Sequence, residues 1–81
     1  MGLDIVEYII EVEDAFHIEI FEGLGIDTVG QLLAFIVSEM QRRGQPILPN
    51  DAWQKLVAIT AKHTKYPIRR ESRFGRDLGL N

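Results

Sequence analysis

The sequence predicts an all-α domain, a small bundle of three main helices with a short fourth one. Three stretches of the chain repeat apolar residues every three or four positions, which is typical of amphipathic helices. The 81 residues are 46% apolar and 26% charged, enough for one hydrophobic core and therefore one domain over residues 1–81. The sequence contains no cysteine, so neither disulfides nor thiolate metal sites supplement that core.

The first helix is expected over residues 3–16. Apolar residues spaced as on one helix face form its inner stripe, namely Ile5, Ile9, Val12 and Phe16, with Val6 and Ile10 widening it. A second, acidic stripe consists of Asp4, Glu7, Glu11 and Asp14. Residues 17–20 alternate like a short extended segment. The short fourth helix is placed at 21–25, where Gly23 and Gly25 also indicate a turn.

The second helix is expected to begin after Thr28, a residue type that favours the N-cap position. Its apolar face consists of Val29, Leu32, Leu33, Ile36 and Met40. Arg42 and Arg43 suit the negative end of the helix dipole, and Gly44 follows them where a left-handed residue commonly ends a helix.

The third helix is expected from Asp51 to about Thr64, after a linker at 44–50 that contains two prolines. Asp51 with Gln54 three residues later resembles a capping box. Its inner face consists of Trp53, Leu56, Val57 and Thr60, and the irregular end of the chain is anchored by Phe74, Leu78 and Leu80. We expect the three helices to bury Phe16, Leu33, Ile36, Trp53 and Leu56 together.

Charge is divided unevenly along the chain. Residues 1–50 hold nine acids against two arginines, whereas residues 51–81 hold seven bases against three acids. The two parts attract each other, within one molecule or between two. The acidic part argues against nucleic acid as a partner, and the basic part alone is too lightly charged to change that. No apolar run is long enough for a membrane helix, so no membrane partner is expected.

The order of the motifs resembles an acyl carrier protein that is circularly permuted. LDIVE at 3–7, EVEDAF at 11–16, IEI at 18–20 and TV at 28–29 resemble the second half of that family, from the prosthetic-group site onward. WQKLVAI at 53–59, ESRF at 71–74 and DLGL at 77–80 resemble its first helix and long loop. The resemblance implies an acyl-carrier-protein-like bundle, cut at the phosphopantetheine site, in which Met1 and Asn81 lie close together.

The resemblance also implies which site residues are kept and which are lost. Gly2 stands where the family has its phosphopantetheine serine, and it has no hydroxyl, so no prosthetic group is expected. Ser38 and Ser72 do not stand at the start of an acidic helix and do not replace it. The family docks basic enzyme surfaces through this helix, and the matching positions here are Asp4, Val6, Glu7, Ile10, Glu13 and Asp14.

The functional expectation is therefore an interaction module that docks a basic protein surface, such as a fatty-acid or polyketide-type enzyme, and that is not itself an enzyme. His17 and His63 are far apart and lack companions at ligand spacing, so no metal is expected. The arginines at 69, 70, 73 and 76 are interpreted as a solvated loop. Two alternatives remain. One is a genuine acyl carrier whose arm is attached elsewhere, and the other is a structural or assembly protein in which the acidic part of one chain packs on the basic part of another, in a dimer that swapping through the linker could form. The N-terminus resembles no secretory signal, which favours the cytoplasm.

Overall fold

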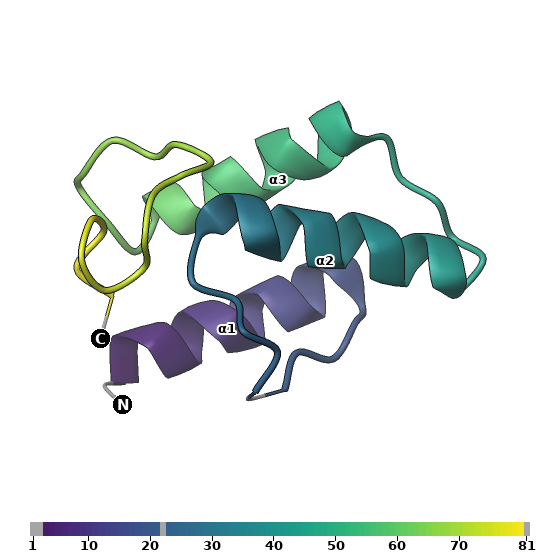
Figure 1. Cartoon of the computed structure of the whole chain (residues 1–81), viewed down its shortest axis with the longest axis horizontal. Coiled ribbons are helices and arrows are strands. Elements are labelled where there is room, and N and C mark those ends of the chain that lie inside the picture. The colour runs from purple at the N-terminus through teal and green to yellow at the C-terminus, as the bar shows by residue number, and fades with distance from the viewer. Residues whose placement is uncertain (1–2, 22, 81) are drawn as a thin grey trace.

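The computed structural model describes residues 3–21 and 23–80, and it contains three helices, α1 (Leu3–Phe16), α2 (Val29–Arg42) and α3 (Pro49–Ala61). Both α1 and α2 pack against α3, and residues 62–80 close one end of the bundle (Figure 1). Within the described ranges there is no β-strand, only an isolated bridge between Thr28 and Arg73. The predicted all-helical class is therefore confirmed.

The expected short fourth helix is absent from the described residues of 21–25. A turn and a bend lie there instead, because Gly23 and Gly25 adopt φ angles of 86° and 72°, which are incompatible with a right-handed helix. The extended segment predicted at 17–20 does not begin at His17, which is a turn residue with a φ of 55°, and residues 18–20 have no regular secondary structure.

Helix α1 has the predicted bounds, but its buried face is rotated relative to the predicted one. Tyr8, Val12 and Phe16 are buried, whereas Ile5 and Ile9 are only partly buried. The reason is that the Tyr8 hydroxyl has a partner inside the core, the hydroxyl of Thr60 on α3, at 2.8 Å. Because Thr60 donates its own proton to the carbonyl of Leu56, Tyr8 donates to Thr60. Burial raises the pKa of Tyr8 to about 12.

Helix α2 begins and ends as predicted. The Thr28 side chain accepts a hydrogen bond from the backbone N–H of Gln31, and the Gln31 side chain accepts one from Thr28 in return, which completes a capping box. At the other end Arg43 is the C-cap, and Gly44 follows it with a φ of 77°.

Helix α3 begins at Pro49 and ends at Ala61, so the predicted start at Asp51 and end near Thr64 were both wrong. Proline occupies the first turn because its missing N–H is not needed there and its fixed φ suits a helix. The N-cap is Leu48, which makes no side-chain capping bond, so the predicted Asp51–Gln54 capping box is not formed. The linker accordingly ends at residue 48.

Four of the five residues expected to be buried together are buried, namely Phe16, Leu33, Ile36 and Leu56. The exception is Trp53, which is half-buried at the edge of the core with the Arg70 guanidinium 5.2 Å from its ring centroid. Helix α3 turns Leu56 and Thr60 inward as predicted, but Ala52 and Ile59 are buried in place of Trp53 and Val57, so the inner face is rotated relative to the predicted one.

The C-terminal segment 62–80 is attached to the start of α2 by its backbone. The first two amides of the helix, at Val29 and Gly30, donate to the carbonyls of Ser72 and Arg70 at 3.0 and 2.7 Å. Its apolar side chains Phe74, Leu78 and Leu80 are buried, as predicted. This segment therefore supplies part of the core as well as the partners of otherwise unpaired helix amides.

The expected contact between Met1 and Asn81 lies outside the described residues. Ile5 and Leu80 line the same groove, so the start of α1 and the end of the segment meet at one end of the molecule (Figure 1). Among the residues placed by the structure, no helix is long and apolar enough to cross a membrane.

Gly30→Ala is expected to lower the free energy of unfolding by about 1–3 kcal/mol, because a Cβ at this position would lie 2.8 Å from the carbonyl oxygen of Arg70. Helix propensity alone would give the opposite sign, a gain of about 0.5–1 kcal/mol. Urea denaturation followed by circular dichroism distinguishes the two. Ser38→Ala, on the exposed side of the same helix, is the control, and a stabilised Gly30→Ala protein would contradict the close packing.

Candidate interaction surface

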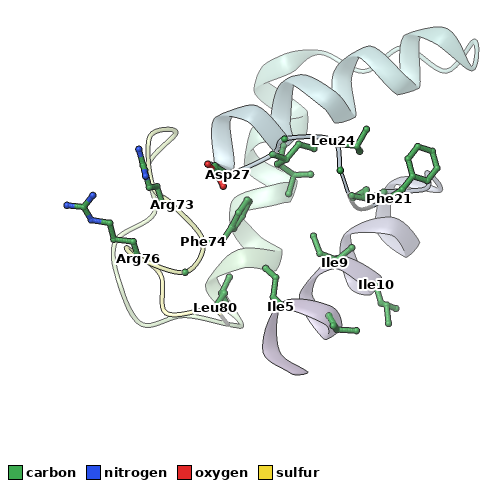
Figure 2. A pocket seen from close by; sticks show the side chains of 17 residues that line it. Ile5, Ile9, Ile10, Phe21, Leu24, Asp27, Arg73, Phe74, Arg76 and Leu80 are labelled. Atoms are coloured by element: carbon green, nitrogen blue, oxygen red, sulfur yellow. The ribbon is translucent and has the colours of Figure 1, made fainter. Parts of the chain in front are cut away.

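A groove of about 690 Å³ runs between α1, the α1–α2 connection and the C-terminal segment. Its floor is apolar and is formed by side chains from all three of these parts and from α2, including Ile5, Ile9, Leu32, Phe74 and Leu80 (Figure 2). Its volume lies in the range typical of small-molecule and docking pockets, about 300–1,000 Å³. The groove is thus a direct product of how the C-terminal segment packs beside α1.

One rim of the groove consists of large apolar side chains that face solvent. Val6 and Ile10 on α1 are 38% and 50% exposed, and Phe21 and Leu24 on the α1–α2 connection are 59% and 39% exposed. Isolated exposed apolar residues are ordinary, but four that line one groove form a patch, and such patches mark interaction sites. We call these four residues the apolar rim.

Two acids flank the apolar rim on the outer surface of α1. Glu7 and Asp14 stand three positions before and four positions after Ile10, which makes them its neighbours on the helix. Both are exposed, and within the described residues neither forms an ion pair. Four of the six predicted docking residues therefore lie together: Val6, Glu7, Ile10 and Asp14.

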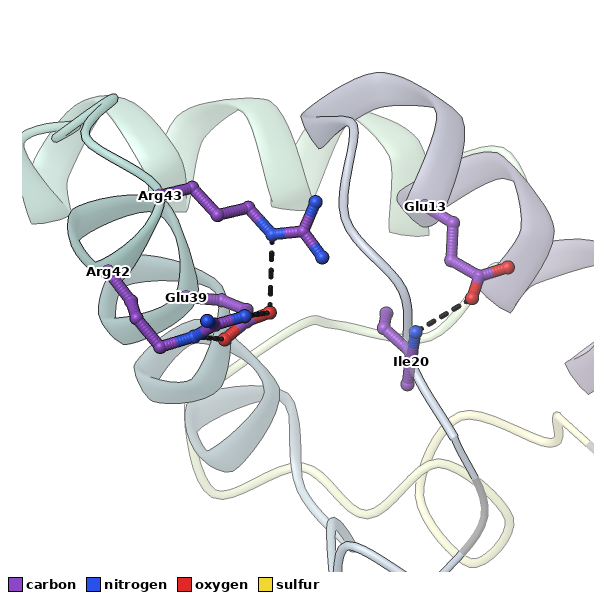
Figure 3. Close-up of polar contacts among 5 residues, drawn as sticks. All are labelled: Glu13, Ile20, Glu39, Arg42 and Arg43. Carbon is purple, nitrogen blue, oxygen red and sulfur yellow. Dashed lines mark hydrogen bonds and ion pairs between the residues drawn. The ribbon is translucent and has the colours of Figure 1, made fainter.

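The other two predicted docking residues adjoin this group but differ from it in their surroundings. Asp4 is exposed and stands three positions before Glu7, yet it lies on the side of α1 that leads to Glu11, seven positions further on, and to α3. Glu13 is already engaged, because its Oε2 accepts the backbone N–H of Ile20 at 2.7 Å (Figure 3). That bond holds the α1–α2 connection against the end of α1.

Glu11, the remaining residue of the acidic stripe, forms ion pairs within the molecule. Its two carboxylate oxygens bind Lys62 Nζ and His63 Nε2, each at 2.9 Å, and so join α1 to the end of α3. The hydrogen bonds from Lys62 and then His63 lower the pKa of Glu11. A similar local arrangement at the end of α2 pairs Glu39 with Arg42 and Arg43 and lowers the pKa of Glu39 to about 2 (Figure 3).

His63 and Ser72 have structural partners, whereas the side chains of His17 and Ser38 are exposed. His63 contacts Tyr8 edge-on with ring centroids 5.5 Å apart and binds Glu11, and His17 ends α1 with a positive φ of 55°. Within 3–21 and 23–80 no group of three or more metal-ligating side chains is found. Ser72 is buried and accepts the Arg69 amide, and Ser38 lies midway along α2. Gly2 lies outside the described residues.

The opposite wall of the groove carries the exposed side chains Arg73 and Arg76 (Figure 2). Two acids accompany them: Asp27 lines the same groove, and Asp77 accepts the backbone N–H of Arg73 at 2.8 Å. Arg70 lies over Trp53 instead. The loop predicted as solvated is therefore exposed at its arginines while its backbone and apolar residues are fixed.

Phe21 and Leu24 were missed by the sequence interpretation, which treated them as parts of a short helix or turn. The available signal was that two large apolar residues stand beside turn glycines, where polar residues are usual.

Comparisons of the chain with protein-family models, with curated proteins and with solved structures give no match.

The ion pairs of Glu11 predict a stability loss in acid. Its pKa is lower in the folded protein than the ordinary value of 4.5, so the unfolded chain takes up the proton first and stability falls as the pH decreases below about 4.5. Glu11→Gln removes this titration, so the decline of Tm from pH 5 to pH 3 should be shallower than in the wild type. Glu7→Gln is the matched control, and identical slopes in all three proteins would contradict the prediction.

Proposed function

We propose that this chain is an acyl-carrier-protein-like interaction module that docks a basic protein surface through α1 and carries no phosphopantetheine arm. The observation that carries the proposal is the placement of Glu7 and Asp14 on either side of Ile10, next to the rest of the apolar rim. An apolar centre with charges at its edge is the usual composition of a transient interface.

The two parts of this surface would act differently on binding. Burial of Ile10 and Phe21 supplies most of the affinity, since each is at least half exposed in the free protein and large apolar groups dominate interface energies. The acids raise the rate of encounter and select a partner of opposite charge. The Glu13 bond to Ile20 fixes the apolar rim in place before binding, which lowers the entropy lost on docking.

The circular permutation is part of this proposal. It is supported by the sequence motifs, by the order of three helices followed by a long packed segment, and by the meeting of Ile5 and Leu80 at one groove. A cut at an exposed position between adjacent elements is a tolerated kind of rearrangement. The same resemblance makes a fatty-acid or polyketide-type enzyme the expected class of partner.

The residues present do not fit a phosphopantetheine group at the family's position. Gly2 has no hydroxyl to form the phosphodiester. Ser72, which directly precedes two groove residues in the chain, is buried, and its oxygen accepts a hydrogen bond from a backbone amide. The proposed function therefore contains no acyl-transfer step and no catalytic residue, and it rests on recognition alone.

A basic amphipathic peptide of lysine and leucine is expected to bind α1 and the apolar rim. In a titration of dilute ¹⁵N-labelled protein, the shifted amides should lie in residues 4–14 and 21–24. Glu7→Lys combined with Asp14→Lys should weaken binding about five- to thirtyfold, the effect of two rim charges of about 0.5–1 kcal/mol each. Asp51→Lys on α3 serves as the control. Shifts distributed evenly over the molecule would refute the proposed surface.

The groove itself favours a second candidate, a genuine acyl carrier that encloses an apolar chain. Its apolar floor and its volume of about 690 Å³ suit such a chain. This candidate requires an attachment site other than Gly2.

The wild-type protein is expected to keep its mass when incubated with coenzyme A and a broad-specificity phosphopantetheinyl transferase, because no hydroxyl stands at position 2. Intact-protein mass spectrometry measures this, with an ordinary acyl carrier protein as the positive control. A mass gain of one phosphopantetheine would favour the second candidate, and peptide mapping would then locate the modified residue.

A further inference from the structure

Opposite charges border the two sides of the groove. Beyond the apolar rim, the outer surface of α1 carries the exposed Glu7 and Asp14, which we call the acidic wall. On the other side the loop at 69–77 carries the exposed Arg73 and Arg76, with the acid Asp27 beside them, and we call this side the arginine wall. Between these walls lie the apolar floor and the apolar rim (Figure 2). The surface therefore changes from basic through apolar to acidic across a single groove.

These charges are largely not neutralised within the molecule. In the described ranges, the only ion pairs that join the acidic part of the chain to its basic part are the two that Glu11 forms, with Lys62 and with His63. Glu7 and Asp14 on one wall, and Arg73 and Arg76 on the other, form no ion pair within those ranges. The molecule thus presents opposite charges that point outward on two sides of one apolar surface.

From this arrangement we infer that the basic partner of α1 is a second copy of the same chain, bound as a two-fold symmetric dimer across the groove. A two-fold axis through the groove mouth brings the arginine wall of each copy over the acidic wall of the other and places the two apolar rims between them. A surface with this charge order is complementary to itself under such an axis, which is the requirement for an isologous interface. The inference rests on the proposed role of α1.

The size of the surface predicts a weak dimer. Stable complexes bury about 800 Å² on each partner, and here the contact is limited to the four rim residues, the groove mouth and the two charged walls. Its stability should therefore depend on protein concentration and decrease as salt screens the exposed charges. A dimer swapped through the linker would behave differently, since the bonds that join its parts are the same as in the monomer and exchange requires unfolding.

Sedimentation velocity over a hundredfold range of concentration tests the inference on the whole chain. The wild type should dimerise at low salt, and this dimer should weaken at least tenfold in high salt. Two variants should each remain monomeric: Glu7→Lys with Asp14→Lys, and Arg73→Glu with Arg76→Glu. All four side chains are exposed, so both variants should fold, as circular dichroism can verify, and Asp51→Lys is the control that should still dimerise.

The decisive measurement mixes the two variants. In the lysine variant both walls of the groove are basic, and in the glutamate variant both walls are acidic. The mixture should therefore form a heterodimer within minutes. A wild type that is monomeric at all concentrations, a dimer that survives in either variant, or a mixture that stays monomeric would each overturn the inference. If the wild type is monomeric while the lysine–leucine peptide still binds α1, the dimer fails and the proposed function stands. If neither associates, both fail.

Discussion

The backbone bonds between the C-terminal segment and the first turn of α2 are the constraint on which the rest of the structure depends. The first amides of a helix have no partner within the helix, and here Ser72 and Arg70 provide carbonyls for two of them while Thr28 provides a side chain for the third. This contact is close because Gly30 has no Cβ. With the segment fixed at this point, Phe74, Leu78 and Leu80 enter the core, and the far wall of the groove is defined.

Polar contacts hold α1 against α3 at two places, one inside the core and one at the surface. The buried Tyr8–Thr60 hydrogen bond sets its rotation, and the surface contacts of Glu11 with Lys62 and His63 hold it against the end of α3. Because Glu11 and Glu13 are both occupied inside the molecule, the acids left on the outer surface are those beside Ile10 and the more distant Asp4. Because Glu11 and Glu13 bind within the molecule, only part of the acidic surface of α1 is presented to a partner.

The bounds of the helices were easier to predict from the sequence than their buried faces or the groove. The bounds of α1 and α2 followed from periodicity and from local capping residues, whose effect does not depend on distant parts of the chain. The start of α3 was missed because Pro49 was interpreted as an interruption, although proline is favoured in a first helical turn. Tyr8 was left out of the predicted core and Trp53 was placed in it, because the hydroxyl partner of Tyr8 and the guanidinium beside Trp53 both come from distant segments. Val6 and Ile10 of the apolar rim were predicted as docking residues, but Phe21 and Leu24 were not, since they border the groove only when α1 and the C-terminal segment are assembled.

The meeting of Ile5 and Leu80 at the groove has a practical consequence for anyone who labels this protein. An affinity tag or fluorescent domain joined at either terminus emerges next to the groove mouth and obstructs whatever binds there. The linker between α2 and α3 lies at the opposite end of the bundle and is largely exposed (Figure 1). A reporter inserted at residues 45–46 would leave the groove accessible, so the position of the label, rather than its size, decides whether binding can be observed.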